Sequence, residues 1–372
     1  MKRLCIAQAV LLATLVLGTG SAYAQPTCSG SPNVNQVCIS PSPAATQFAG
    51  MLGTTPEQIT NDILAQVNGL FQTTDVASFL RDFQNAQAFS SKGLGVDYAS
   101  ETTRVEVGAT ISFASNVDKA YKPSGSSTDP PISGGGANFS LMGGLGFGMF
   151  GFEPLMLFGN WFKGSATLGQ LNGSYNNWGM HGQLRLFGPS RQSSAVKLLV
   201  RWGGIAITSG ADYSRMTLSA GKKIQSSFAL PSYAVGAPQG SVSVQSSGTL
   251  TFALEQTTWS VPLEVTTSLR LLSLVTLYGG FGLDFQLGGG SDVHIDMQDA
   301  ALSGRIPGTT ATDLGTASIS VNQHVSPSPA RLREIVGLQL GIFDVVRFFV
   351  QVNTTGSSPM LTSVAAGLRV GI

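Results

Sequence analysis

Charged side chains are scarce in this sequence: only 11% of its 372 residues are Asp, Glu, Lys or Arg, against about a quarter in a typical soluble domain. A soluble chain of this length would expose too few charges to stay dispersed. A protein whose outer surface is covered by lipid needs fewer of them. The net charge is +1, so no basic field indicates a nucleic-acid partner.

Long apolar runs are also missing after the first two dozen residues, which argues against a helical membrane span in the mature chain. The start of the chain, MKRLCIAQAVLLATLVLGTGSAYAQ, is different. Lys2 and Arg3 precede an apolar core, and Ala22-Tyr23-Ala24 forms a small-x-small cleavage site. These features predict a signal peptide over residues 1–24 and an exported chain that begins at Gln25.

Cysteine is rare as well, with three in the whole sequence. Cys5 is removed with the signal peptide, so Cys28 and Cys38 remain as an even pair in an exported chain, and we expect them to form a disulfide. A metal site would need more ligands, and no His or further Cys lies nearby. We expect no cofactor. Residues 25–54 are rich in Ser, Pro, Thr, Asn and Gly and predict a loop held by this disulfide.

Helical periodicity follows in residues 55–91. Thr55-Pro56-Glu57-Gln58 provides an N-cap, a proline at the first helical position and a Gln three residues after the cap. Apolar residues then recur at helical spacing, and a second short helix is predicted from about 76 to 89. The two amphipathic helices would form a small periplasmic segment or a plug in a barrel mouth; alternatively they pack only on each other.

Apolar and polar residues alternate with period two from about residue 103 to the end, which is typical of strands with one apolar face. WSVPLEVTTSLRL (259–271) is a clear example: every second side chain from Trp259 to Val265 is apolar, and the residues between them are mostly polar. The ten predicted strands lie at 103–113, 137–150, 155–168, 178–186, 196–202, 251–271, 275–287, 331–342, 345–353 and 361–372.

The connections between these predicted strands alternate in length. Short links fall at 151–154, 187–195, 272–274 and 343–344, and long polar links fall at 114–136, 209–250 and 288–330. A soluble sandwich predicts no such alternation. Outer-membrane barrels have short periplasmic turns and long extracellular loops, and an even number of strands returns both termini to the periplasm. The apolar faces are therefore expected to contact lipid.

Taken together, residues 103–372 resemble bacterial outer-membrane β-barrel proteins as a general class. The resemblance implies an all-β fold: a closed antiparallel transmembrane barrel of about ten strands, within a range of eight to twelve, preceded by a short periplasmic helical segment. The barrel domain would cover 92–372. The expected partners are outer-membrane lipid and the outer-membrane assembly machinery. Members of the class commonly end on an aromatic residue, whereas this chain ends on Ile372.

The polar faces of the predicted strands carry eight basic residues and three acidic ones, so the lumen is expected to be mildly basic. The predicted lumen-lining residues are Arg104, Glu106, His181, Arg185, Lys197, Arg201, Glu264, Arg270, Asp284, Arg333, Arg347 and Arg369. One interpretation is a narrow diffusion channel for small solutes. The other is an internal salt-bridge network that fills the barrel, because only about sixteen strands leave a wide aqueous channel.

Histidine, which could perform catalysis, is also scarce, with three in the chain. Asp292, His294 and Asp296 share one face of SDVHIDM and could orient a water molecule, but no matching partner motif occurs elsewhere. His181 and His324 are isolated, and the sequence has neither GxSxG nor HExxH. We therefore expect a structural or narrow-channel protein and no enzyme. The alternative is a surface enzyme or adhesin that acts through the long extracellular loops.

Overall fold

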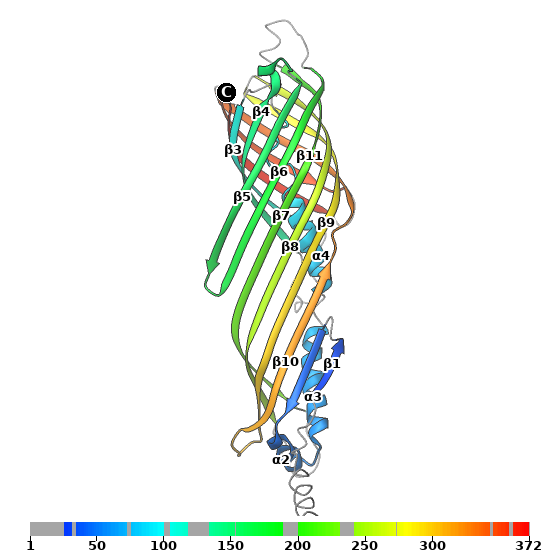
Figure 1. Cartoon of the computed structure of the whole chain (residues 1–372), viewed down its shortest axis with the longest axis vertical. Coiled ribbons are helices and arrows are strands. Elements are labelled where there is room, and N and C mark those ends of the chain that lie inside the picture. The colour runs from blue at the N-terminus through cyan, green and yellow to red at the C-terminus, as the bar shows by residue number, and fades with distance from the viewer. Residues whose placement is uncertain are drawn as a thin grey trace, which may run out of the picture. The chain divides into compact units, whose positions relative to one another are not determined.

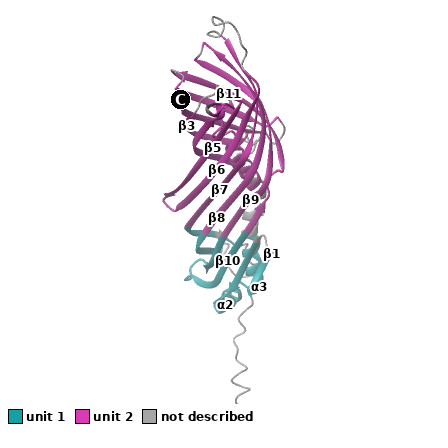
Figure 2. Ribbon diagram, turned by 45° about the horizontal axis from the view of Figure 1, so that its top comes forward, with its two compact units in different colours: residues 1–73, 222–250, 296–321 teal, residues 74–221, 251–295, 322–372 magenta. Residues whose placement is uncertain are grey.

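The computed structural model describes residues 26–31, 35–72, 76–99, 105–117, 134–152, 154–188, 200–230, 242–272, 274–342, 345–356 and 360–371. The chain divides into two compact units (Figure 2). Unit 1 comprises 1–73, 222–250 and 296–321, and unit 2 comprises 74–221, 251–295 and 322–372. Three predicted strands extend into undescribed residues: 103–113 is seen only from 105, 196–202 only from 200, and 361–372 only to 371.

The described helices and strands are labelled in Figure 1. The helices are α2 (Pro43–Met51), α3 (Pro56–Gln72), α4 (Val76–Ser90) and the short 3-10 helix η1 (Phe147–Phe150). The strands are β1 (Thr27–Ser31), β2 (Asn35–Pro41), β3 (Val105–Asn116), β4 (Gly135–Gly146), β5 (Leu155–Leu168), β6 (Leu171–Phe187), β7 (Val200–Ala229), β8 (Ser243–Leu271), β9 (Val275–Arg305), β10 (Thr312–Val325), β11 (Ala330–Ile342), β12 (Val346–Thr354) and β13 (Leu361–Gly371).

The two predicted helices correspond to α3 and α4, and α2 is a third helix that the sequence did not reveal. The predicted cap is present at the start of α3, where the Gln58 N–H donates to the Thr55 hydroxyl at 3.3 Å. Glu57 in the first turn favours the same end because its charge complements the helix dipole. No helix in the described part of the chain is long and apolar enough to cross a membrane.

Ten strands of the sheet close into a ring (Figure 1). The hydrogen-bonded order runs from β9 through β11, β12, β13, β3, β4, β5, β6 and β7 to β8, and a further pairing of β8 with β9 closes the circle. Neighbouring strands in this ring pair antiparallel, for example β3 with β4 and β12 with β13. The ring confirms the predicted antiparallel barrel of about ten strands.

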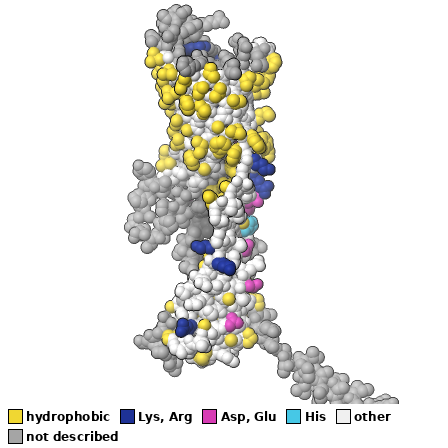
Figure 3. All heavy atoms as spheres, turned by 90° about the vertical axis from the view of Figure 1, so that its left-hand side faces the viewer, with side chains coloured by type: hydrophobic (Ala, Val, Ile, Leu, Met, Phe, Trp, Pro, Cys, Tyr) yellow, Lys and Arg dark blue, Asp and Glu magenta, His cyan; other side chains and the backbone are white. Residues whose placement is uncertain are grey.

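Alternation along the ring strands separates an apolar outer face from a polar inner face. Val107, Phe281 and Val336 are 58%, 62% and 65% exposed, whereas Ser140 and Asn353 are fully buried. On the face shown in Figure 3, hydrophobic side chains gather over the barrel with few charged ones between them. A closed ring with an apolar outer belt and a polar interior is the architecture of an outer-membrane β-barrel, because only lipid leaves such a belt stable.

An aromatic cluster lies on three neighbouring strands of unit 2. The ring of Trp259 on β8 is 4.7 Å from Tyr213 on β7 and 5.2 Å from Trp178 on β6, measured between centroids. Trp and Tyr gather at the edges of the apolar belt of membrane barrels because their rings are apolar and their N–H or O–H groups are polar. This cluster therefore places one edge of the belt near Trp259.

The prediction of long loops at 209–250 and 288–330 is wrong, because most of the described residues in these two stretches form strands. The predicted loops 209–250 and 288–330 contain the ends of β7, β8 and β9, which are 30, 29 and 31 residues long, and the whole of β10. Many of these residues are small or polar on both faces, so no clear alternation marks them in the sequence. The barrel domain predicted over 92–372 therefore includes two stretches, 222–250 and 296–321, that belong to unit 1.

The predicted loop at 25–54 is also structured. It contains β1, β2 and α2, and β2 pairs antiparallel with β10 from Pro41 with Gly315 to Asn35 with Val321. The N-terminal segment and the 288–330 stretch therefore share one sheet. The expected orientation of these segments relative to the membrane stays a prediction.

The predicted disulfide is confirmed. Cys28 and Cys38 are directly opposite one another on β1 and β2, with Cα atoms 4.1 Å apart, and their sulfur atoms are bonded. The core of unit 1 lies beside this hairpin. Phe48 and Leu52 from the end of α2, Ile63 from α3 and Ile39 from β2 are all nearly fully buried.

Candidate functional site in the barrel lumen

The lumen of unit 2 contains α4 and the chain segment that follows it, residues 91–99, and we call α4 and this segment together the lumen segment. All of residues 82–99 are buried. Phe83 packs with Leu254 and Val293, and Phe89 packs with Leu361. The predicted plug in the barrel thus comes from the second predicted helix and not from both.

Close approach of α4 to β4 depends on glycine. A Cβ atom on Gly136 would lie 2.5 Å from the Gln87 Cα, so no larger residue fits there without displacing the helix. The side-chain amide of Gln87 forms two hydrogen bonds with the backbone of Ala137 on the same strand. It donates to the Ala137 carbonyl and accepts from the Ala137 N–H, each at 3.1 Å. The amide mimics a strand neighbour and attaches the helix to the wall.

Polar contacts attach the same helix to three further strands. The Gln84 amide donates to the Thr258 hydroxyl of β8 at 3.2 Å and accepts a short hydrogen bond from Ser291 of β9. Asn116 of β3 donates to Asp82 at 3.2 Å. Buried polar groups cost free energy unless they are hydrogen-bonded. These hydrogen bonds therefore hold α4 in one position against the strands.

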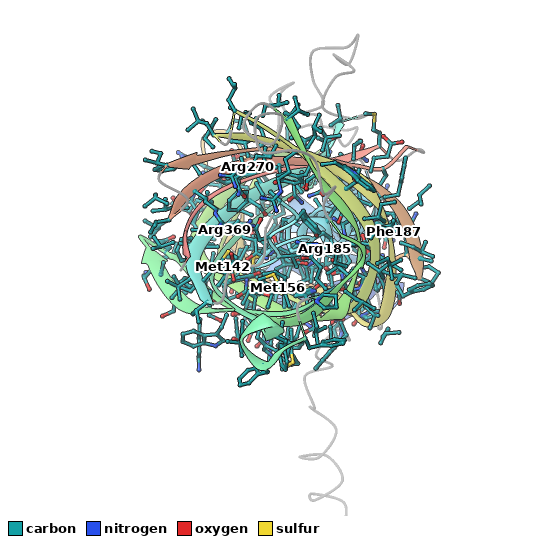
Figure 4. The ribbon with its side chains drawn as sticks, turned by 90° about the horizontal axis from the view of Figure 1, so that it is seen from above. Met142, Met156, Arg185, Phe187, Arg270 and Arg369 are labelled. Atoms are coloured by element: carbon teal, nitrogen blue, oxygen red, sulfur yellow. A yellow bond between two sulfur atoms is a disulfide. The ribbon has the colours of Figure 1, made fainter. Side chains whose placement is uncertain are left out.

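Asp97 is the centre of the first buried ion cluster. It is fully buried, and its carboxylate lies 2.7 Å from Arg369 of β13 and 3.2 Å from Arg347 of β12. Arg369 also donates to the Val96 carbonyl at 2.5 Å and covers the Phe349 ring at 3.9 Å. Figure 4 shows Arg369 inside the ring of strands. The cluster holds the end of the lumen segment against two neighbouring strands.

Arg333 of β11 forms the second cluster. Its guanidinium is fully buried, donates to Glu264 of β8 and Asp284 of β9, and reaches Asn353 at 3.0 Å. Tyr98 of the lumen segment donates to the other Glu264 oxygen at 2.7 Å.

Asp212 of β7 is the centre of the third cluster. It lies 3.0 Å from His181 of β6 and 3.7 Å from Lys92 of the lumen segment, and Lys92 also donates to Ser260 of β8. Serine, lysine, histidine and aspartate are catalytic types in other settings, but here each side chain is buried in the wall or the lumen segment. The arrangement is a closed ion network.

The structure places the predicted lumen residues as follows. Those buried inside unit 2 are Glu106, His181, Glu264, Asp284, Arg333, Arg347 and Arg369, those partly buried are Arg185, Arg201 and Arg270, and Arg104 and Lys197 lie outside the described residues. Sequence reasoning missed Lys92 and Asp97, because they occur in a stretch without strand periodicity, and Asp212, because it lies in a predicted loop.

The missed residues change the charge of the lumen. The described buried charges of unit 2 are the carboxylates Asp82, Asp97, Glu106, Asp212, Glu264 and Asp284 and the cations Lys92, Arg333, Arg347 and Arg369. The partly buried Arg185, Arg201 and Arg270, together with the partly buried Arg331 on the same face of β11 as Arg333, bring the cations to eight against six carboxylates. The predicted basic excess of eight to three includes Arg104 and Lys197, which lie outside the described residues, so it stays a prediction.

Little free space remains near the end of the lumen segment. A cavity of about 20 Å³ lies between Ala99, Arg270 and Arg347, and the turn residue Leu274 borders it. A single water needs about 10–15 Å³, so the cavity holds one or two waters.

The alternative catalytic residues Asp292 and His294 lie on β9 and His324 lies on the neighbouring strand β10, with the Ser326 hydroxyl 3.5 Å from the Nε2 atom of His324. Asp292 pairs with His324 at 2.7 Å, and His294 contacts Asn322 at 2.6 Å, with both histidines exposed. Across the described part of the chain, no group of three His, Cys, Asp or Glu side chains could hold a metal ion.

A protein-family model named Lsa36-like matches residues 21–372, almost the whole chain. The chain belongs to the Lsa36-like family. No protein among the curated sequences matches it.

Several solved structures show low similarity to this family member. The translocator domain of the autotransporter NalP from Neisseria meningitidis is 12% identical, with a TM-score of 0.30, and the match covers 77% of this chain and 93% of that one. Ail, the attachment invasion locus protein of Yersinia pestis, is 11% identical over 72% and 96%, with a TM-score of 0.23. The toluene transporter TbuX from Ralstonia pickettii is 8% identical over 78% and 95%, with a TM-score of 0.24. Similarity this low assigns no property of these proteins to the present chain.

Proposed function

We propose that the protein is a closed outer-membrane β-barrel that serves as an anchor and passes no solute in its resting state. The observation that carries this proposal is the set of three buried ion clusters, around Asp97, Arg333 and Asp212, that join the lumen segment to the strands around it. The two sequence-based interpretations were a narrow channel and a filled barrel, and these clusters favour the filled barrel. No catalytic activity is proposed.

In planar lipid bilayers, we expect the unaltered protein to give no steady conductance. Asp97→Asn should produce frequent openings, because Arg347 and Arg369 lose the charge that they share and residues 91–99 are released. Asp292→Asn is the matched control, since Asp292 pairs with the exposed His324 outside the three clusters, and it should stay silent.

A large steady conductance of the unaltered protein would contradict the anchor proposal. A small one that prefers anions would instead support a narrow channel through the cavity beside Arg270 and Arg347, where two cations face the free space. The conductance should then lose selectivity as salt screens the two charges.

The direction of the lumen segment supports a second part of the proposal, namely that the N-terminal residues are extracellular. Asp82 contacts Asn116, the last residue of β3, whereas Ala99 borders the cavity beside the β8–β9 turn residue Leu274. The lumen segment thus runs toward the end where β3 begins and β13 ends (Figure 1). In this class of barrel, that end with short turns and the C-terminus is periplasmic.

Labelling of intact cells with a membrane-impermeant maleimide tests this orientation. Thr46→Cys on an exposed position of α2 should be labelled without permeabilisation, because residues before the lumen segment would begin on the outer side. Leu274→Cys, in the β8–β9 turn and 51% exposed, should be labelled only after the outer membrane is opened. The reverse pattern would show that the N-terminal residues are periplasmic, as the sequence first indicated.

A further inference from the structure

Unit 1 contains an apolar pocket of about 360 Å³. Its described wall comes from α3 and from β2, β7, β8, β9 and β10. The lining includes the aliphatic side chains of Ile39, Ile63 and Leu302 and the uncharged polar side chains of Gln66 and Ser226. All of them belong to unit 1, whereas the three ion clusters of the lumen belong to unit 2.

The sheet of unit 1 has an apolar face that lines the pocket and a polar face on its other side. On β10, Ala317 and Ile319 line the pocket, whereas Ser318 and Ser320 lie on the opposite, polar face. On β2, the buried Val37 and Ile39 line the pocket in the same way. Alternation along both strands therefore gives the pocket a continuous apolar wall.

Strand β9 contains an irregularity that keeps its apolar residues on this wall. Asp299 has a φ of 49°, which is uncommon for a non-glycine residue, and Gln298 and Asp299 are both exposed in succession. In a regular strand, an odd-numbered and an even-numbered residue point to opposite faces. The extra residue shifts this alternation by one position, so Met297 before it and Leu302 after it both line the pocket.

The polarity of the pocket changes from its base to its rim. Ile39, Ile63 and Leu302 at the base are at most 2% exposed, whereas Gln66 and Ser226 are exposed. None of the described lining residues carries a charge. An apolar base with a few uncharged polar groups at the opening is the pattern of a small-molecule site, and it selects against ionised ligands.

Water is a poor occupant of such a space. Each buried water needs two to four polar partners, which the aliphatic base does not offer. An engineered apolar cavity of about 150 Å³ admits benzene, and the pocket of unit 1 is more than twice that volume. Burying an alkyl chain here removes its apolar surface from water, which favours binding.

We propose that this pocket binds one alkyl chain with an uncharged polar end, the chain against Ile39, Ile63 and Leu302 and the polar end near Gln66 and Ser226. The chemistry is shared by a free long-chain alcohol and by an acyl chain of a membrane lipid. The proposal does not depend on whether the barrel conducts or which side of the membrane unit 1 occupies.

Photolabelling of the full chain in lipid nanodiscs tests the binding. The probe is decanol that carries a diazirine, and the labelled peptides are identified by mass spectrometry. We expect labelling at residues 37–39, 63, 297–302 and 317–319 that is lost when excess unlabelled decanol competes. Saturable labelling requires a site, whereas labelling of the lipid-facing strands should rise in proportion to the probe concentration.

A second arm, with a diazirine on the acyl chain of the nanodisc lipid, distinguishes the source of the occupant. Labelling of the same peptides in that arm identifies membrane lipid as an occupant.

A matched pair of variants on β10 completes the test. Ala317→Phe places a ring inside the pocket and should remove most of the saturable labelling, whereas Thr316→Phe, at the neighbouring position on the opposite face, should leave it unchanged. Competition on the unaltered chain does not depend on either variant folding. The proposal fails if neither probe labels these peptides, or if decanol labels them without saturation and equally in both variants.

Discussion

Arg333→Met is expected to lower the free energy of unfolding of the barrel by about 3 to 5 kcal/mol, the range for breaking a buried ion pair from one side. Arg333 is fully buried and is the cation that Glu264 and Asp284 share. Its removal leaves the two carboxylates buried inside the barrel without the positive charge that they share. Urea unfolding of the protein in lipid vesicles measures the change.

Two further variants separate charge from packing. Arg215→Met breaks an ion pair with Glu255 in which both side chains are about half exposed, and an exposed pair contributes only about 0 to 1 kcal/mol. Adding Glu264→Gln and Asp284→Asn to Arg333→Met should recover much of the lost stability, because no uncompensated charge then remains. Equal losses for Arg333→Met and Arg215→Met, or no recovery in the triple variant, would show that the cluster does not hold the barrel together.

Val265→Arg should destabilise the barrel by about 2 to 4 kcal/mol, the cost of an arginine on the lipid face at the bilayer midplane. Val265 is 47% exposed on the outer face of β8. It lies six residues after Trp259, whose aromatic cluster places one edge of the belt, and six before Leu271, where the strand ends. Reversible unfolding from vesicles of defined thickness gives the free energy.

Leu271→Arg is the control for depth. Leu271 has the same strand parity as Val265 but is the last residue of β8, where an arginine reaches water and costs about 0 to 1 kcal/mol. The difference between the two variants depends on lipid covering the outer face. If both variants cost the same, the apolar belt does not span the bilayer where the structure places it.

The sequence by itself determined the wall of the barrel. Strict alternation in stretches such as 259–271 predicts strands whose outer faces are apolar, because side chains in a strand point to opposite sides in turn. Trp259, Leu263 and Val265 are exposed, and Ser260 and Glu264 are buried, as that pattern requires. The pairing of Cys28 with Cys38 was predictable as well, since it needs only export and an even number of cysteines.

Strand ends and the ring closure were not predictable in the same way. Closure depends on β8 meeting β9 after all ten strands have twisted together, which no local pattern encodes. The long continuations of β7, β8 and β9 are poor in alternation, because small and polar residues occupy both of their faces. They are strands only because each one continues a ladder that begins in the apolar belt.

The interior was decided by the tertiary structure alone. Lys92 and Asp97 lie in a stretch without periodicity. Nothing in the neighbouring sequence indicates that Lys92 pairs with Asp212, or that Asp97 pairs with Arg347 and Arg369. A polar strand face has the same pattern whether it lines water or contacts a plug. Which of the two is present depends on what the rest of the chain places inside, since a buried charge is stable only where a partner reaches it in space.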